Sequence, residues 1–337
     1  MSSAPRISVC VANYNASELL VRCLQSVLSQ NVAEVVQVIV HDDASSDDSL
    51  ARLAADFPDV RVIASSDNVG YCMANNRMLE VAVGDYVLLL NNDAWLEPGA
   101  LQVLMDYAGA HPPAILTLAQ LDAGTGELLD CGMGLDLLCT PFPHSQRVTR
   151  EVATVIGACL WLPRQLWHDV GGFPAWFESI GEDLYLCQRA RLRGVPVVAL
   201  AEAAYYHVSG HSFGGGKLQQ GRMASTFRRR YLSERNRLYV MCLVYPPLLL
   251  VPLLPLAGLA LLVEGLLLSL WRMDLEAPRR IYLPALAGPV RERARLRALR
   301  RDLQRERTAG TGAFLGGLSP VPYKLRMLAR RGLPTLR

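Results

Sequence analysis

Residues 35–46 read VVQVIVHDDASS, in which an apolar run gives way to a cluster of small polar residues. Val35–His41 is short and rich in β-branched residues, which predicts a buried strand. The polar turn that follows begins with Asp42 and Asp43, and a short helix is expected over Asp47–Asp56. The stretch therefore predicts one strand–turn–helix unit with two carboxylates at the end of its strand.

The same alternation of strands and helices extends along the chain in both directions. The expected strands are Ile7–Asn13, Val60–Ala64, Tyr86–Leu90, Val195–Leu200 and Ala203–Val208, and the expected helices are Ser17–Gln30, Tyr71–Val83, one that begins at Pro98, and Asp183–Arg193. A hairpin is expected around Gly124–Gly126. This order predicts an α/β fold with a mostly parallel central sheet. Ligands of such sheets bind beyond the carboxyl ends of the strands, where Asp42–Ser46 and Asn91–Asp93 stand.

The charges of the 337-residue chain are unevenly distributed. Residues 1–226 contain 13 Lys and Arg against 24 Asp and Glu, whereas residues 227–337 contain 21 against 7. An acidic first part and a basic second part indicate two different roles, the second one facing an anionic partner. Because 51% of the residues are apolar, the chain can bury a large core, which excludes wholesale disorder.

The eight cysteines include no C-x-x-C pair, and several lie inside apolar runs such as Ile7–Ala12. This pattern predicts buried, reduced thiols rather than a disulfide framework or a zinc site. No apolar signal segment precedes the first expected strand, so we expect the first part of the chain to lie in the cytoplasm.

The chain has no glycine before Gly70, which excludes a glycine-rich dinucleotide or phosphate loop from the first strand–helix unit. Residues 214–217 read GGGK but lack the spacing of a P-loop. A nucleotide's phosphates would then be held through a divalent metal ion, and Asp93, directly after an apolar strand, is placed to bind one. Taken alone, Asp93 could equally cap a turn, and Asp42-Asp43 could be a solvated turn.

Eight short motifs follow one another along the chain. They are Val9–Asn15 (VCVANYN), Val40–Ser49 (VHDDASSDDS), Asn68–Asn76 (NVGYCMANN), Leu88–Asp93 (LLLNND), Gly157–Pro163 (GACLWLP), Gly171–Phe173 (GGF), Gly181–Asp183 (GED) and His207–Ser212 (HVSGHS). This succession resembles glycosyltransferase family 2, the inverting enzymes of GT-A fold, and within it the bacterial rhamnosyltransferase-like branch. The resemblance covers residues 5–240.

The resemblance implies a donor site with a metal ion. The residues that it implies in nucleotide binding are Ala12, Asn13, Asp42, Asp43, Asn68, Asn76 and Asn92. A divalent cation, Mg²⁺ or Mn²⁺, would be held by Asp93 and His207, with Asn91 in place of the first carboxylate of the family's D-x-D motif. Taken alone, Asn68–Asn76 is also compatible with a capped helix, and His207 with a surface histidine at a strand end.

The resemblance also implies a general base. Asp183 would take this role with Glu182 in support, while Tyr185 stands where the family often has a further aspartate. Taken alone, the two acidic residues could instead complement the dipole of the helix that they begin. Trp176 and Phe177 precede this motif and are open to two interpretations, a wall facing the sugar or part of the core.

The second part of the chain contains 26 consecutive uncharged residues between Arg237 and Glu264. This exceeds the ~20 residues that span a bilayer, but prolines interrupt its first half and basic residues flank both ends. We therefore expect a re-entrant or interfacial hairpin rather than a simple spanning helix. Arg291–Arg307 contains eight arginines with leucines at helical spacing, which predicts a basic amphipathic helix for anionic lipid. It has no interleaved aromatic residues, so a nucleic-acid partner is not expected.

These patterns predict a catalytic domain over residues 1–226, a hydrophobic membrane-associating segment over 227–275 and a basic tail over 276–337. The expected reaction moves a sugar, of rhamnose type, from a dTDP- or UDP-linked donor to a glycan or polyprenyl-linked acceptor with inversion. The expected location is the cytoplasmic side of the plasma membrane, peripheral or monotopic. Two alternatives are a nucleotidyltransferase, which would need a basic residue that Val9–Asn15 lacks, and a non-catalytic nucleotide-sugar-binding membrane protein.

Overall fold

The computed structural model describes residues 7–33, 36–208, 218–219, 222–331 and 335–336. Contacts divide the chain into two compact units. The first, the sheet unit, comprises the chain up to Met133 together with residues 143–190 and 195–208. The second, the helical unit, comprises residues 134–142, 191–194 and 209–337. The predicted division at residues 226 and 275 is based on charge and hydropathy and stays a prediction.

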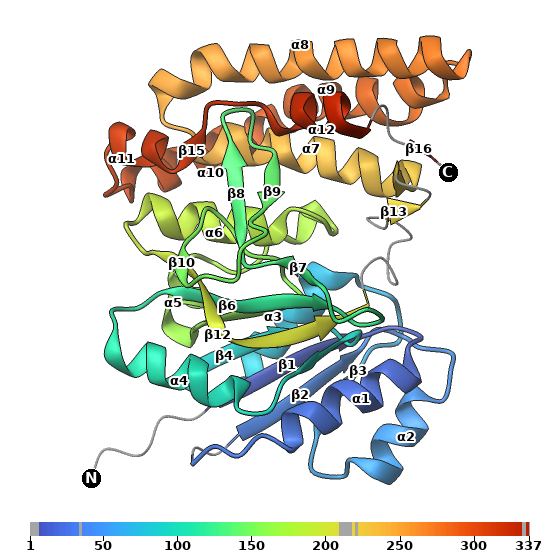
Figure 1. The fold of residues 1–337 in the computed structure, drawn as a ribbon, viewed down its shortest axis with the longest axis vertical. Coiled ribbons are helices and arrows are strands. Elements are labelled where there is room, and N and C mark those ends of the chain that lie inside the picture. Colours follow the sequence, from blue (N-terminus) through green and yellow to red (C-terminus); the bar gives the residue numbers. More distant parts are fainter. Residues whose placement is uncertain (1–6, 34–35, 209–217, 220–221, 332–334, 337) are drawn as a thin grey trace. The chain divides into compact units, whose positions relative to one another are not determined.

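The sheet unit is built on one ten-stranded mixed sheet (Figure 1). Its main path runs in the order β10, β12, β6, β11, β4, β1, β2, β3, with β5 paired to β12 and β7 to β6. The strands are β1 (Ile7–Asn13), β2 (Val36–Asp42), β3 (Arg61–Ala64), β4 (Tyr86–Leu90), β5 (Ala94–Leu96), β6 (Ile115–Asp122), β7 (Leu128–Asp130), β10 (Arg150–Glu151), β11 (Cys159–Pro163) and β12 (Val197–His207). On the main path β3, β2, β1, β4, β6 and β12 point the same way, whereas β11 and β10 are antiparallel to their neighbours. The predicted α/β fold with a mostly parallel sheet is confirmed.

Helices pack on this sheet (Figure 1). They are α1 (Ser17–Leu28), α2 (Ser49–Asp56), α3 (Tyr71–Val81), α4 (Ala100–Ala110), α5 (Arg164–Asp169), the 3₁₀ turn η1 (Ala175–Phe177) and α6 (Glu182–Leu192). Ile7, Val9 and Val11 alternate along β1 and point into a core shared with Leu24 of α1 and Leu104 of α4. Helix α3 packs against β1 and β2 outside that core. The elements expected from the sequence are therefore present, with ends that differ by a few residues.

Three further features bear on the sequence predictions. The two strands expected over 195–200 and 203–208 form the single strand β12, whose pairing with β6 shifts between Leu200 and Ala204. The expected hairpin joins β6 to β7, where the amide of Gly126 donates to the carbonyl of Asp122. Seven of the eight cysteines are buried, as predicted, and Cys242 is half-buried.

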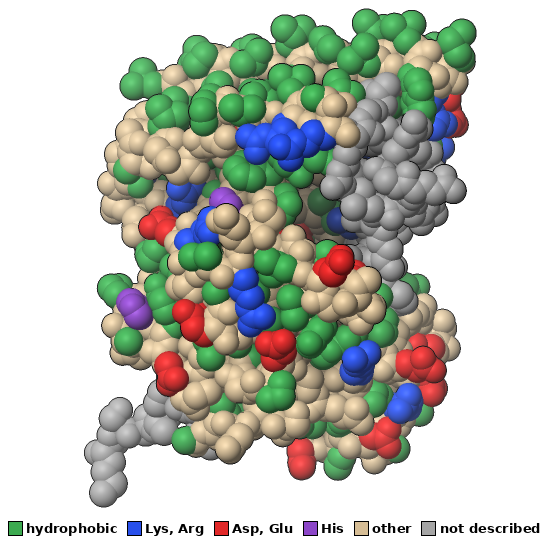
Figure 2. All heavy atoms as spheres, viewed as in Figure 1, with side chains coloured by type: hydrophobic (Ala, Val, Ile, Leu, Met, Phe, Trp, Pro, Cys, Tyr) green, Lys and Arg blue, Asp and Glu red, His purple; other side chains and the backbone are tan. Residues whose placement is uncertain are grey.

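The helical unit contains residues 209–337 and two short earlier segments. Its helices are α7 (Phe227–Val244), α8 (Pro247–Arg272), the π-helical turn η2 (Pro278–Tyr282), α9 (Leu283–Arg291), α10 (Arg293–Arg305), α11 (Thr311–Gly316) and α12 (Tyr323–Arg331). Its short strands are β8 (Met133–Asp136), β9 (Pro141–Pro143), β13 (Leu218–Gln219), β14 (Arg222–Ser225), β15 (Leu318–Ser319) and β16 (Thr335–Leu336). Hydrophobic side chains line the rim of this unit along α8 (Figure 2). The residues 214–217 and 209–212 of two sequence motifs lie outside the described residues.

The uncharged segment turns at Tyr245 and Pro246: its first residues end α7 at Val244, and the rest lies in α8, one helix of 26 residues. That this segment associates with a membrane as a hairpin stays a prediction. Pro247 stands in the first turn, where a proline needs no hydrogen-bond partner for its missing N–H. Pro252 and Pro255 lie inside the helix, and each removes one backbone hydrogen bond without ending it. Among the described residues α8 is the one helix long and apolar enough to cross a membrane. The expected basic helix is present as α10, with Leu296 and Leu303 buried.

Candidate active site

The carboxyl ends of β1, β2 and β4 bring three of the expected nucleotide-binding side chains into one hydrogen-bonded chain. Asn13 donates through Nδ2 to Oδ2 of Asp42 at 3.0 Å, and Asn92 donates through Nδ2 to Oδ1 of Asn13 at 2.9 Å. Asn13 and Asp42 are paired residues in the parallel register of β1 and β2. All three side chains are buried, and Ala12 lies half-buried one residue earlier on β1. The parallel sheet therefore explains why residues from three distant motifs meet at one edge.

The Asp43 side chain is hydrogen-bonded to the loop that precedes α3. Its two carboxylate oxygens accept from the backbone amides of Val69 at 2.7 Å and Gly70 at 2.9 Å. Gly70 has a φ of +82°, in the region where a side chain would be strained. The Asp43 carboxylate therefore holds the start of the 68–76 segment beside the carboxyl end of β2.

The structure does not bring Asn68 and Asn76 into the Asn13–Asp42–Asn92 chain. Asn68 is exposed. Asn76, on α3, binds both backbone groups of Phe173, donating through Nδ2 to the carbonyl at 2.9 Å and accepting from the amide at 3.1 Å. Its amide thus connects α3 to the GGF motif, which gives this residue a structural task that the sequence analysis did not anticipate.

Asp93 and His207, the two expected metal ligands, lie side by side. Pairing of β5 with β12 sets His207 opposite Ala94, and Nε2 of His207 is 3.2 Å from Oδ1 of Asp93. That oxygen is buried and makes no well-aligned hydrogen bond. Among the described residues no third His, Cys, Asp or Glu completes a metal cluster with them. A buried carboxylate oxygen facing an imidazole nitrogen suits one Mg²⁺ or Mn²⁺ ion whose remaining ligands come from substrate phosphate and water.

The sequence analysis missed the two residues that orient His207. Gln120, on β6, has Nε2 3.1 Å from Nδ1 of the imidazole, and Tyr205 donates its hydroxyl to Oε1 of Gln120 at 2.8 Å. With the Gln120 amide turned so that Oε1 accepts from Nδ1–H, this contact fixes the ring plane and the tautomer in which Nε2 can bind a cation. The available signal was a glutamine in an otherwise apolar strand, because buried amides need partners. Nearby, burial raises the pKa of Asp130 to about 7, although the amide of Gly132 opposes that shift.

Asp183 occupies the first turn of α6 after a strained backbone. Glu178 and Ile180 have positive φ values of 66° and 67°, and Gly181 has 93°. Oδ2 of Asp183 accepts from the amide of Gly157 at 3.0 Å, while Glu182 beside it is buried. The strained turn and the Gly157 amide together set the direction of the Asp183 carboxylate.

Tyr71 lies within electrostatic range of both Asp183 and Asp93. Its hydroxyl donates to the carbonyl of Gly157 at 3.0 Å. Burial raises the pKa of Tyr71 well above its ordinary value, and the charges of Glu182, Asp183 and, more weakly, Asp93 raise it further. Tyr71 therefore stays protonated as a hydrogen-bond donor within electrostatic range of both acidic groups.

Of the two aromatic residues before α6, Phe177 belongs to the interior. Phe177 is fully buried, with its ring 4.7 Å from that of Trp176 and 5.6 Å from that of Tyr185. Tyr185 is also buried, so the position where the family often has an aspartate is a packing position here. Of the two interpretations, the core one holds for Phe177, whereas Trp176 is half-buried.

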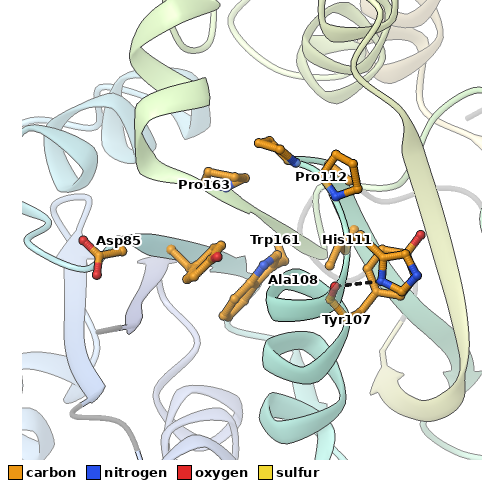
Figure 3. A pocket seen from close by; sticks show the side chains of 11 residues that line it. Asp85, Tyr107, Ala108, His111, Pro112, Trp161 and Pro163 are labelled. Atoms are coloured by element: carbon orange, nitrogen blue, oxygen red, sulfur yellow. Dashed lines mark hydrogen bonds between the residues drawn. The ribbon is translucent and has the colours of Figure 1, made fainter. Parts of the chain in front are cut away.

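A cavity of about 220 Å³ lies at the other end of the sheet (Figure 3). Its lining includes Tyr86, the first residue of β4, whose ring stacks on Trp161 at 5.2 Å. His111 stacks on Tyr107 at 3.9 Å and completes one wall. None of the expected site residues lines this cavity. The functional groups gather instead at the carboxyl ends of the strands, as expected for this class of sheet.

Parts of the chain are similar to known glycosyltransferases. Residues 8–169 match the family model described as "Glycosyl transferase family 2". Over 239 residues the chain is 26% identical to N-acetylglucosaminyl-diphospho-decaprenol L-rhamnosyltransferase of Mycobacterium tuberculosis, covering 62% of this chain and 78% of that protein. It spans 13–31% of the length of three other curated relatives that it matches.

Solved structures share the fold. GalNAc-T7, solved with UDP, GalNAc and Mn²⁺, is similar with a TM-score of 0.64 at 12% identity, over 100% of this chain and 60% of that chain. A mannosyltransferase from Pyrobaculum calidifontis, solved with GDP-Man and Mn²⁺, is similar with a TM-score of 0.52 at 15% identity, over 94% of this chain and 86% of that one. The fold is therefore the GT-A fold, and residues 8–169 of the chain match glycosyl transferase family 2.

Proposed function

We propose that the protein is a glycosyltransferase that moves a sugar from a nucleoside diphosphate donor to an acceptor hydroxyl. The observation that carries this proposal is the pairing of the buried Asp93 carboxylate with His207 at 3.2 Å. Asp93 lies in the turn between β4 and β5, next to Asn92 of the Asn13–Asp42–Asn92 chain, and His207 is the last residue of β12. The family 2 domain supports the same reaction class.

In this proposal one group of residues binds the nucleoside of the donor, and a second group holds a cation at its diphosphate. Ala12, Asn13, Asp42, Asp43 and Asn92 line the nucleoside side, with Asn68 at the rim of the loop that Asp43 anchors. Asp93 and His207 hold the divalent cation. When bound, Mg²⁺ or Mn²⁺ neutralises the charge that develops on the leaving nucleoside diphosphate. The Mn²⁺ in the two structures of similar fold supports this choice of ion.

Asp183 acts as the base. An acceptor hydroxyl has a pKa far above 7, so its proton must be taken as it attacks the anomeric carbon. The amide of Gly157 holds one oxygen of Asp183, which leaves the direction of the carboxylate defined for that transfer. One displacement inverts the anomeric centre, and the pair of close carboxylates of a retaining hydrolase is not needed. Glu182 supports the turn from which Asp183 projects.

The proposed donor carries a rhamnose-type sugar linked to dTDP or UDP, and the proposed acceptor is a glycan or a polyprenyl-linked sugar. The mycobacterial relative, named for rhamnose and for a decaprenol-linked substrate, supports both choices. We place the protein at the cytoplasmic side of the plasma membrane, where such an acceptor would be presented. The apolar helix α8 supports membrane association.

The proposal is tested by incubating the purified protein with a panel of nucleotide sugars and Mn²⁺ and measuring nucleoside diphosphate release with and without a polyprenyl-diphosphate sugar. Release that depends on one donor and on the acceptor is the expected result. Nuclear magnetic resonance of the product then gives the anomeric configuration. Retention of the donor's configuration would overturn the single displacement, and absence of release with every donor would overturn the function.

A further inference from the structure

Helix α8 has one face that packs on the helical unit. Ala257, Leu261, Gly265 and Leu268 are fully or nearly fully buried, and their spacing of four, four and three residues defines one side of the helix. This side packs against α7, η2 and α9. A side chain at Gly265 would stand 3.0 Å from the ring of Tyr282, so the glycine permits a close approach to η2. The inner face of α8 therefore makes specific contacts with other helices of the same unit.

The opposite face of α8 is apolar and exposed. Its large exposed side chains are Leu248, Val251, Leu256, Leu259, Leu262, Val263, Leu266, Leu267, Leu270 and Trp271. No charged residue interrupts this outer face before Arg272. Among the described residues, six large hydrophobic side chains of the sheet unit are exposed, against 18 in the helical unit. Folded monomers seldom leave an apolar surface of this kind to water.

The one charged residue of α8 before its terminal Arg272 is Glu264, which is on the inner side and is paired. Glu264 accepts from Lys324 of α12 at 2.8 Å and forms an ion pair with Arg230 of α7. Lys324 and Arg230 also contact Glu234 of α7, at 2.5 Å and 3.1 Å. Burial alone would raise the pKa of Glu264, but the two cations hold it below its usual value. These contacts connect α8 by charge to two other helices of the same unit.

We propose that α8 lies in the plane of a membrane leaflet that contains anionic phospholipid, with its outer face inserted and its inner face on the protein. This inference is based on the proposed membrane location and adds the orientation. Because the helical unit covers the inner face of α8, only the outer face is free to enter the headgroup–acyl boundary, which an interfacial helix does by about 5–10 Å. The 21 basic against 7 acidic residues after position 226 match an anionic surface.

A spanning orientation conflicts with the contacts of the inner face. A 26-residue helix is about 39 Å long, enough to cross the ~30 Å hydrocarbon core. However, α7 packs alongside it and carries Arg230, Glu234 and Arg237 in the ion network. Crossing would place this network in the hydrocarbon core or separate Glu264 from its partners, and both carry a large cost. The in-plane orientation leaves every one of these contacts intact.

Vesicle flotation tests the lipid surface. The full-length protein should float with phosphatidylglycerol-containing vesicles and bind less to pure phosphatidylcholine. Leu259→Glu and Leu266→Glu should each reduce binding to the anionic vesicles by roughly tenfold or more. Leu50→Glu is the matched control, because Leu50 is an exposed leucine on α2 of the sheet unit, and it should bind as the unaltered protein does. Circular dichroism confirms that each variant is folded.

Depth measurement tests the orientation. Cysteines introduced at Leu248, Leu259 and Leu270 carry a fluorophore, since seven of the eight native thiols are buried. With brominated lipids, an in-plane helix gives one quenching depth for all three sites. A deep Leu259 site between two shallow ones would show a spanning helix and overturn the orientation.

Two further outcomes overturn the inference. If the unaltered protein does not float with vesicles, the membrane location is wrong. The proposed reaction is tested independently of this result, by measuring donor turnover. A lipid-free dimer that Leu259→Glu and Leu266→Glu dissociate would show that a second copy of the chain covers this face.

Discussion

Both units bury carboxylates, but they surround them differently. In the helical unit Glu234 is within 3.1 Å of Arg230, Arg237 and Lys324, and Glu264 shares two of these cations. In the sheet unit Asp93 has a histidine at 3.2 Å and an oxygen without an aligned hydrogen bond. A buried carboxylate whose charge is fully compensated holds elements together. One whose charge is incompletely compensated is placed to bind a cation, and this difference separates the structural cluster from the candidate site.

The largest expected effect is on Asp93. Asp93→Ala should abolish turnover, by at least about 10³-fold, because it removes the main carboxylate ligand of the cation. Turnover is measured by nucleoside diphosphate release and Mn²⁺ affinity by calorimetry in the presence of UDP. Because this carboxylate is poorly compensated, thermal stability should not fall. Asp106→Ala, at an exposed carboxylate on α4, is the control and should leave both measurements unchanged. Full activity of the unaltered protein in excess chelator would contradict the metal requirement.

The next effect is on Asp183. Asp183→Asn keeps the shape and the contact with the Gly157 amide but removes the basicity, so turnover should fall by about 10²–10⁴-fold. Donor affinity, measured by calorimetry, should stay nearly unchanged, since other residues bind the nucleotide. Joint loss of turnover and affinity would mean that Asp183 shapes the donor site. Normal turnover would transfer the base role to Glu182 or another carboxylate.

In the charge-compensated cluster around Glu234, removal of the carboxylate should reduce stability rather than turnover. Glu234→Gln removes the carboxylate that pairs with Arg237 and leaves Lys324 with Glu264 alone, so it should lower the free energy of unfolding by about 3–5 kcal/mol. Glu276→Gln, at a half-exposed carboxylate of the same unit, should change it by less than about 1 kcal/mol. Denaturant unfolding in mild detergent measures both. Equal stability of the two variants would show that the cluster contributes little.

The same cluster predicts a pH dependence. Burial alone would raise the pKa of Glu234, but Lys324, Arg237 and Arg230 hold it below its usual value of 4.5. The unfolded state then binds the proton more tightly than the folded state. The stabilisation is therefore present above about pH 4.5 and is lost as the pH falls below it. Glu234→Gln should remove this acid-side slope from a plot of unfolding midpoint against pH.

The sheet unit was largely predictable because its pattern is local. Strands such as Ile7–Asn13 and Tyr86–Leu90 have the predicted bounds, since each is a short apolar run between polar turns. The parallel register of β1 and β2 then places Asn13 opposite Asp42, and both residues were already expected in the nucleotide site from their motifs. Gln120 and Tyr205 were missed because their partnership joins residues 85 positions apart and depends on the pairing of β6 with β12.

The helical unit was less predictable because its charges are compensated across helices. The uncharged segment and its prolines indicated a hairpin, yet α8 continues through Pro252 and Pro255. Its stability comes from inner-face packing and from the Glu264 contacts with α7 and α12, which no local pattern encodes. In the structure Glu264 lies inside the helix, eight residues before its end.

The smallest expected effect concerns Gln120, the positioning residue for His207. A cation bound through Nε2 requires the ring proton on Nδ1, and Gln120 then accepts it through Oε1. The Tyr205 hydroxyl can donate or accept, so it can partner either orientation of the amide. Gln120→Ala should weaken Mn²⁺ binding about 10–100-fold, with turnover recovered at high Mn²⁺. Gln120→Glu, which still accepts from Nδ1, should restore the affinity. Equal Mn²⁺ affinity in Gln120→Ala and the unaltered protein would show that Asp93 and substrate phosphate hold the cation without the help of an oriented His207.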